Sequence, residues 1–249
     1  MHRLLVETPL LLQDDVALPK EAARHLKVLR PKTGEEIELF DGQGRTRVYH
    51  FNGQTSRLDT PNGAAARHPR SATALTLFAC VTKGSRWDWT IEKAVELGAT
   101  RIVPVISDRC IVRLAPDERE AKAERWRRIA EDAARQSDAV WLPEIVAPVD
   151  FAKSLEFVRE CGAVFVGALA NPPPPPLLTA ISQLQKENPA AAERGLGMYV
   201  GPEGDFTPEE LRSLLEIAVP TSFGPTVLRA ETAAIFGLSV LAAAVTRDA

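Results

Sequence analysis

The residues with the clearest chemical potential lie in the stretch 198–211 (MYVGPEGDFTPEEL), where an apolar run is followed by glycine, proline and carboxylates. Thr207, Pro208 and Glu210 fit the N-cap, N1 and N3 positions of a capping box, so a helix is expected to begin at Pro208. The Gly-Pro-Glu-Gly turn before it therefore follows a strand at its carboxyl end, which is where open α/β sheets bind ligands.

The chemistry of this turn favours a cationic or neutral ligand. Gly201 and Gly204 allow either close backbone approach or a positive φ angle. Glu203 and Asp205 bring two carboxylates to the positive end of the expected helix, where they would repel a phosphate. The alternative for this motif taken alone is a tight strand-to-helix turn that binds nothing.

A second Gly-Pro turn occurs in residues 222–238 (SFGPTVLRAETAAIFGL), after a short expected strand. Arg229 and Glu231 stand at the start of an almost wholly apolar helix and are candidates for catalysis, with an ion pair or a helix cap as the structural alternative. A helix that is apolar on all sides must be buried, by its own domain or by a second subunit. We therefore expect a homodimer.

The elements that would position these turns alternate between strand and helix after residue 70. Continuous apolar runs predict strands at 74–81, 101–106, 163–169 and 196–200. Helical periodicity predicts helices at 86–97, 117–136, 151–159, 177–186, 208–217 and 231–245. This alternation is typical of an α/β domain with a parallel sheet, which we place at residues 71–249.

Residues 1–70 have a different pattern and predict a small β-rich domain. Short strands are expected at 3–7, 35–40 and 46–51, with one helix at 20–29. The segment 59–71, rich in Pro, Gly and Ala, is expected to be a linker. The run 172–176 is five consecutive prolines, which predicts a stiff polyproline-II spacer.

Composition narrows the class of protein. With 45% hydrophobic and 25% charged residues, the chain is typical of a globular protein rather than a disordered or coiled-coil one. No apolar stretch approaches the roughly 18–20 residues that cross a bilayer. The start MHRLLVETPL has neither a signal-peptide nor a transit-peptide pattern, so we expect a cytoplasmic protein without membrane contact.

Charge and cysteine usage add two expectations. Residues 1–70 carry a formal charge of +2 and the remainder −5, so a mildly basic N-terminal domain could contact nucleic acid. Cys80, Cys110 and Cys161 are spaced neither as a disulfide framework nor as zinc ligands. We therefore expect reduced cysteines and no metal.

The two Gly-Pro motifs in combination resemble the RsmE family of bacterial 16S ribosomal RNA uridine N3-methyltransferases, within the SPOUT superfamily. The resemblance extends to Lys83-Gly84, TIEKAVELGATRIVPVISDRC (90–110), RWRRIAEDAARQS (125–137) and LPEI (142–145). It implies an α/β fold, namely a trefoil-knotted SPOUT methyltransferase domain preceded by a small PUA-like β-barrel that binds RNA.

The resemblance also implies a cofactor, a substrate and residue roles. S-adenosylmethionine would bind within the knot, and a specific uridine of 16S ribosomal RNA, in the small ribosomal subunit, would be methylated at N3 in an unpaired state. The implied cofactor residues are Gly201, Pro202, Glu203, Gly204, Phe223, Gly224, Val227, Leu228, Ala230 and Thr232. Arg229 would contact the base or a phosphate, and Glu231 would anchor the motif. The implied RNA contacts are Arg3, Arg24, Lys27, Arg30 and Lys83, for which an ordinary solvated surface is the alternative.

The chain departs from the family pattern at three positions. Arg135 stands where the family usually has Glu, and Ala139 and Thr226 stand where it usually has Arg. Fewer arginines predict weaker phosphate contact. Two other functions therefore remain open: a non-catalytic RNA-binding or ribosome-assembly factor, and methylation of a different RNA nucleotide. A Rossmann-type nucleotide enzyme would need a Gly-x-Gly-x-x-Gly turn after an early strand, and the sequence has none.

Overall fold

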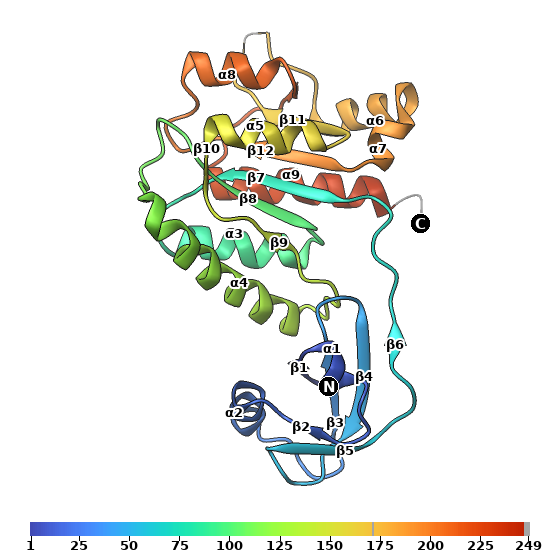
Figure 1. The fold of residues 1–249 in the computed structure, drawn as a ribbon. Helices are drawn as coiled ribbons and strands as arrows, with labels where there is room; N and C mark the ends of the chain where they lie inside the picture. The colour runs from blue at the N-terminus through green and yellow to red at the C-terminus, as the bar shows by residue number, and fades with distance from the viewer. Residues whose placement is uncertain (171, 247–249) are drawn as a thin grey trace. The chain divides into compact units, whose positions relative to one another are not determined.

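The computed structural model describes residues 1–170 and 172–246, which form two compact units (Figure 1). The first unit comprises Met1–Arg70 together with Glu131–Leu142. The second comprises Ser71–Ala130 and the chain from Pro143 onward. The division into domains 1–70 and 71–249 stays a prediction. In the structure, residues 131–142 fold with the first unit.

The first unit is built on a mixed sheet with the strand order β1-β3-β4-β5-β2, and β6 pairs with β4. Its elements are β1 (His2–Leu5), α1 (Thr8–Leu11), β2 (Val16–Ala17), α2 (Lys20–Leu29), β3 (Glu36–Phe40), β4 (Arg45–His50), β5 (Arg57–Pro61) and β6 (Ala66–Arg67). Helix α2 has the predicted bounds and buries Ala22 and Leu26. These side chains join a core that includes Ile37, Leu39 and Tyr49.

The segment 59–71 is not the simple linker that its composition predicted. Its first residues belong to β5, and Ala66 and Arg67 of β6 pair with Thr46 and Arg45 of β4. The prediction was wrong because Pro, Gly and Ala are poor strand formers by local propensity. Pairing with a strand some twenty residues earlier supplies the hydrogen bonds that local sequence does not indicate.

Residues 131–142 are attached to the first unit through its Asp41–Gly44 turn. The amide of Leu142 donates to the carbonyl of Gly42, and the amide of Gly44 donates to that of Val140, both at 2.9 Å. Gly44 has a φ of 84°, and a Cβ atom there would lie 2.4 Å from the ring of Trp141. Only glycine fits this position, because a side chain would be both strained and in collision.

The second unit has a parallel sheet with the order β10-β8-β7-β12-β11-β13, and β9 pairs with β8. Its strands are β7 (Leu75–Cys80), β8 (Arg101–Ile106), β9 (Glu144–Ile145), β10 (Val149–Asp150), β11 (Ala163–Gly167), β12 (Leu196–Val200) and β13 (Val219–Thr221). The α/β class with a parallel sheet is therefore confirmed. The trefoil knot stays a prediction.

The helices of the second unit follow the predicted segments closely. They are α3 (Ser85–Glu96), the 3-10 turn η1 (Pro116–Glu118), α4 (Arg119–Gln136), α5 (Phe151–Glu160), α6 (Leu177–Glu187), α7 (Pro189–Glu193), α8 (Pro208–Leu215) and α9 (Ala230–Thr246). Helix α4 begins in the second unit and ends in the first. Elements β9, β10 and α7 were not predicted from the sequence, because two to five residues carry too little periodicity.

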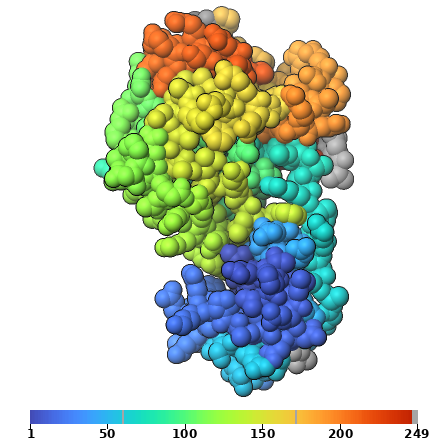
Figure 2. All heavy atoms as spheres, in the orientation of Figure 1, coloured from blue at the N-terminus to red at the C-terminus, as the bar shows by residue number. Residues whose placement is uncertain are grey.

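The two faces of the parallel sheet are covered by different helices. On one face, α5 and α8 pack their residues Phe151 and Leu214 into a core with Phe78 and Tyr199. In the space-filling view, the atoms of α5 (yellow) and α8 (orange-red) adjoin at the surface (Figure 2). Neighbouring strand residues point to opposite faces, and Met198 accordingly lies against Gly237 of α9 on the other face.

Helix α9 is only partly covered by its own unit. It packs against α3, α6, β7 and β12. Its buried hydrophobic residues are Ala233, Ala234, Leu238, Leu241 and Ala244. Phe236, by contrast, is 39% exposed, and its ring lies 5.5 Å from that of Phe223. In the described part of the chain no helix combines the length and the apolarity that a membrane span requires.

Candidate functional site

A pocket of about 360 Å³ lies at the carboxyl ends of β11, β12 and β13. It is lined by residues 167–169 after β11, by 200–203 and 205 after β12, and by 221–224, 226–230 and 233 after β13. Because the three strands are parallel neighbours, their carboxyl ends meet at one edge of the sheet. The two Gly-Pro turns singled out in the sequence are thus brought together.

Glycines allow the loops around the pocket to approach one another closely. A Cβ atom on Gly167 would lie 2.6 Å from the ring of Phe223. On Gly201 it would lie 3.0 Å from the ring of Phe206. Gly224 has a φ of 117°, a conformation that other residues rarely adopt. A larger side chain at Gly167 or Gly201 would therefore press on these rings, whereas at Gly224 it would strain the backbone.

Of the two roles expected for Gly201 and Gly204, a positive φ angle or close approach of the backbone, the structure favours close approach. Neither has a positive φ. The left-handed residue of this loop is Asp205, with a φ of 59°, and its side chain accepts a hydrogen bond from the amide of Phe206 at 2.8 Å. Asp is one of the few residue types besides Gly that tolerates this conformation.

Most of the predicted cofactor residues line the pocket: Gly201, Pro202, Glu203, Phe223, Gly224, Val227, Leu228 and Ala230. Gly204 and Thr232 are outside this lining. Gly204 instead packs on Arg109, whose Cβ would be 3.3 Å from a Cβ at position 204. Thr232 is exposed on the first turn of α9. The roles of all ten residues remain predictions.

The carboxylate of Glu203 is partly neutralised at the pocket wall. Its Oε1 lies 3.7 Å from Nη1 of Arg86, which is in the first turn of α3. Asp205 also lines the pocket. Glu203 and Asp205 thus place two carboxylates on the β12–α8 side of the pocket, which favours a cationic or neutral ligand over an anionic one.

The two catalytic candidates differ in their surroundings. Arg229 is exposed and lines the pocket. Glu231 is only 8% exposed and lies outside the lining. Its Oε2 has no hydrogen-bond partner within residues 1–170 and 172–246. No ion pair joins Arg229 to Glu231 within those same residues, so the simple ion-pair alternative is not supported.

Arg3 must be removed from the expected RNA contacts. It is 5% exposed, and its Nε donates to Glu38 at 2.6 Å. Its Nη1 donates to the carbonyl of Ala134 at 2.7 Å, and the guanidinium lies 4.4 Å from the Phe40 ring centre. A guanidinium held on all sides inside the first unit is not accessible to a phosphate.

The other expected RNA contacts are accessible. Arg24 and Lys27 are exposed on α2, three residues apart and so on one side of the helix, and Arg30 is exposed at its C-cap. Lys83 is exposed in the segment between β7 and α3 of the second unit. Their exposure fits both RNA contact and an ordinary solvated surface.

The three departures from the family pattern lie in different places. Arg135 and Ala139 belong to the first unit, where Arg135 pairs with Asp132 at 3.0 Å. The carbonyl of Ala139 accepts from Arg3 at 3.3 Å. Thr226 is exposed and lines the pocket of the second unit. Thr226 therefore stands in the pocket lining at a position where the family usually has an arginine.

Sequence reasoning missed the third loop of the pocket, residues 167–169. The available signal was the predicted apolar strand ending at this point, followed by a proline run. In the described part of the chain no group of three or more His, Cys, Asp or Glu residues is placed to hold a metal ion.

Comparison with known proteins defines the class. A family model described as RNA methyltransferase domain matches residues 69–242. A second model, described as RNA methyltransferase PUA domain, matches residues 18–52. The parallel α/β unit and its pocket are thus those of an RNA methyltransferase, and the expected combination with a PUA domain is confirmed.

Individual relatives narrow the class further. Ribosomal RNA small subunit methyltransferase E of Mycobacterium bovis is 31% identical over 228 residues, covering 86% of this chain and 80% of that protein. The protein of that name from Synechocystis sp. is 29% identical over 246 residues, covering 96% and 76%. The chain belongs to the ribosomal RNA small subunit methyltransferase E family.

Solved structures agree with this assignment. Ribosomal RNA small subunit methyltransferase E from Neisseria gonorrhoeae, bound to S-adenosylmethionine, matches with a TM-score of 0.80 and 27% identity over 97% of this chain and 96% of that one. A Legionella pneumophila methyltransferase in complex with the same cofactor matches with a TM-score of 0.77 and 28% identity over 97% of both chains.

Proposed function

We propose that this protein transfers a methyl group from S-adenosylmethionine to N3 of a specific uridine in small-subunit ribosomal RNA. The observation that carries the proposal is the pocket in which both Gly-Pro loops meet at the carboxyl ends of parallel strands. Relatives that share the fold over nearly the whole chain have been crystallised with this cofactor.

The pocket suits S-adenosylmethionine in size and charge. Its volume of about 360 Å³ is within the range of small-molecule sites, about 300–1,000 Å³. The backbone of residues 201–203 and 223–230 would hold the cofactor, and Glu203 would attract its positive charge. When bound, S-adenosylmethionine supplies a methyl group that its sulfonium already activates. The protein's task is then orientation and exclusion of water.

The acceptor nitrogen determines what the protein must do to the RNA. Uridine N3 lies on the Watson–Crick edge and carries a proton, so the base must be splayed out and deprotonated before it can attack. Arg229, exposed at the pocket, is placed to stabilise the resulting imide anion or to contact a phosphate.

Glu231 would anchor the second Gly-Pro loop. A buried carboxylate oxygen without a hydrogen-bond partner is energetically costly. The Oε2 of Glu231 has no partner among the described residues, and this favours a donor that arrives with cofactor or RNA. Such a donor would couple ligand binding to the ordering of the motif.

RNA docking is proposed for the first unit. Arg24, Lys27 and Arg30 would contact phosphates, and Lys83 would add a contact from the second unit. Phosphate contacts position a nucleic acid without reading its sequence. The choice of uridine would then depend on the shape of the RNA. We propose that this shape is the one in the assembled small ribosomal subunit, and that the reaction takes place in the cytoplasm.

We also propose a homodimer formed through α9. Its partly exposed side is apolar at Ile235, Phe236 and Val240. Exposed apolar surface on a helix of this kind is typical of an interface.

The test is methyl transfer from labelled S-adenosylmethionine to small subunits isolated from a strain that lacks the gene, followed by mapping of the modified base. N3-methyluridine at one position is the expected product. Cofactor binding without incorporation would favour the non-catalytic assembly factor. If the label were found on another base, that base and not a uridine would be the methyl acceptor.

A further inference from the structure

The carboxylate of Glu210 has a second partner beyond its helix cap. Its Oε2 accepts from the amide of Thr207 at 2.9 Å, which completes the predicted capping box. Its Oε1 accepts from the amide of Asp108, also at 2.9 Å. Glu210 is 7% exposed. This buried side chain therefore joins the start of α8 to a turn that follows β8.

Arg109, the next residue of that turn, is bonded to the loop between β12 and α8. Its Nη1 donates to the carbonyls of Gly204 and Phe206, both at 3.2 Å. The close packing of Gly204 on Arg109 described above belongs to the same contact. Backbone carbonyls at both ends of the stretch 204–206 are thus attached to one guanidinium.

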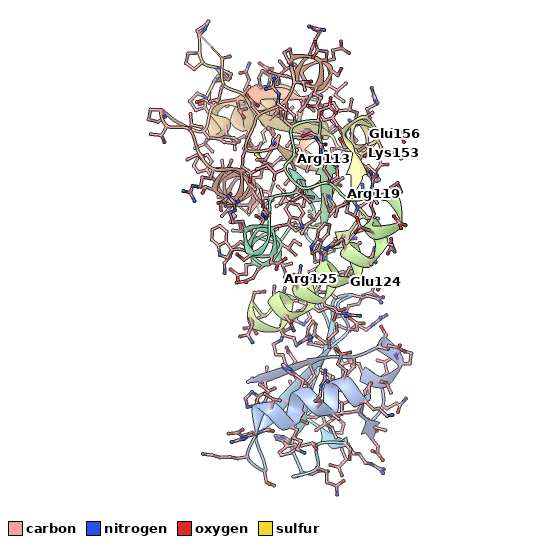
Figure 3. The ribbon with its side chains drawn as sticks, turned by 90° about the vertical axis from the view of Figure 1, so that its left-hand side faces the viewer. Arg113, Arg119, Glu124, Arg125, Lys153 and Glu156 are labelled. Carbon is pink, nitrogen blue, oxygen red and sulfur yellow. The ribbon has the colours of Figure 1, made fainter. Side chains whose placement is uncertain are left out.

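The turn that carries these groups is itself firmly held. The amide of Cys110 donates to the carbonyl of Ser107 at 3.1 Å. Arg113, on the segment between β8 and α4 (Figure 3), donates to the same carbonyl at 3.1 Å. Arg113 also donates to the carbonyl of Asp108. Residues 107–110 therefore form a rigid support rather than a free loop.

The loop on this support needs outside anchors. Within the stretch 201–206 its internal backbone hydrogen bond joins the amide of Asp205 to the carbonyl of Pro202 at 3.0 Å. Asp205 has a left-handed φ of 59°, which a free chain would seldom populate. Residues 201–203 and 205 nonetheless line the pocket, so their positions depend on what holds the loop from behind.

We propose that Arg109 and Glu210 are positioning residues that fix the 201–206 loop in the conformation that binds S-adenosylmethionine. This inference rests on the proposed function for the identity of the ligand. Neither residue lines the pocket. Their influence therefore reaches the cofactor only through the loop, as preorganisation of the backbone groups that contact it.

The experiment compares Arg109→Ala, Arg109→Lys and Glu210→Gln with two controls. The controls, Arg212→Ala and Glu209→Gln, lie on α8, the helix that carries Glu210. Both control residues are exposed. The dissociation constant of S-adenosylmethionine is measured by calorimetry on the full-length chain. The KM values for cofactor and RNA, kcat and the melting temperature are measured in parallel.

Arg109→Ala and Glu210→Gln are expected to weaken cofactor binding about tenfold, the effect of losing one hydrogen bond to a charged group. The KM for the cofactor should rise similarly, while the KM for RNA stays unchanged. Arg109→Lys should recover part of the loss because an ammonium can still donate to one carbonyl. The controls should bind as the wild type does.

The outcomes separate this inference from the proposed function. Wild-type affinity in Arg109→Ala and Glu210→Gln would overturn the positioning role and leave the methyltransferase proposal intact. The positioning role would also fail if both variants melted early and cofactor and RNA binding declined together. A wild-type chain that did not bind S-adenosylmethionine would overturn both.

Discussion

The guanidinium of Arg3 donates a hydrogen bond of 2.7 Å to the carbonyl of Ala134, across 131 residues of sequence. The same side chain pairs with Glu38 at 2.6 Å. Strand β1 and the end of α4 are thereby joined inside the first unit. A residue that sequence assigned to RNA contact is in fact a structural crosslink.

Arg3→Ala is expected to destabilise the first unit, because it leaves the mostly buried carboxylate of Glu38 without its partner. Breaking a buried ion pair costs about 3–5 kcal/mol, which a fall in melting temperature would reveal. Arg24→Ala is the matched comparison: it should melt normally and lower the log–log salt slope of RNA binding by about one. Equal RNA effects from both variants would contradict the assignment.

Thr226→Arg should be tolerated, because Thr226 is exposed at the pocket rather than packed in the interior. The added guanidinium should steepen the salt dependence of RNA binding by about one unit of log–log slope. Affinity across a salt series, measured beside the melting temperature, checks this. Early melting without any gain in affinity would mean that the position is structural.

Gly224→Ala should weaken cofactor binding by strain alone. Gly224 has a φ of 117°, and a Cβ atom there would meet nothing within 4 Å. The left-handed conformation costs a residue with a Cβ about 1–2 kcal/mol, enough to shift the loop. Gly34→Ala is the control in the other unit, since Gly34 has a φ of 90° and equally open surroundings.

The two glycine variants should therefore differ in one readout. Both should lower the melting temperature, but only Gly224→Ala should raise the dissociation constant of S-adenosylmethionine. Calorimetry on both proteins distinguishes the cases. Undiminished binding by Gly224→Ala would show that this loop is free to adjust.

The thiol of Cys110 predicts a pH dependence of stability. A hydrogen bond from Cys80 is the main cause that lowers the pKa of Cys110 from 9.0 to about 6, against the opposing effect of burial. The folded state therefore loses this proton at lower pH than the unfolded state does. The contribution of the Cys110 thiol to the free energy of unfolding should therefore grow as pH rises from about 6 to 9 and be lost as pH falls through about 6.

Urea unfolding of the wild type and of Cys110→Ala over this pH range measures that contribution. The difference between their unfolding free energies should increase with pH. Cys161→Ala serves as the control because burial raises the pKa of Cys161, so the contribution of this thiol to stability cannot grow as pH rises toward 9. A pH-independent difference for Cys110→Ala would show that Cys110 titrates normally.

Phe236→Ser should convert the proposed dimer into a monomer. Phe236 is 39% exposed on α9, and loss of a central aromatic side chain typically removes a large share of interface energy. Light scattering at micromolar concentration gives the mass. Leu178→Ser, which alters a 47% exposed residue of α6, should leave the mass unchanged. A wild-type monomer would refute the dimer itself.

Local signals in the sequence determined much of the second unit. Strands β8 and β12 have the predicted bounds, because a short apolar run between turns can be assigned as a strand from the local sequence. The start of α8 was predicted because its capping box is formed by residues three apart. Helix α2 was predicted from its periodicity together with Pro19 before it and Pro31 and Gly34 after it. The two Gly-Pro motifs identified the family.

Tertiary structure decided which groups became neighbours. The burial of Arg3, the return of residues 131–142 to the first unit and the third loop of the pocket all depend on distant contacts. The side chain of Glu210 makes one contact that is local in sequence and one that depends on the tertiary structure. One oxygen satisfies its own helix, as the sequence predicted, and the other bonds Asp108 across 102 residues. No local propensity encodes that second bond, because it exists only once parallel strands have brought their carboxyl ends together.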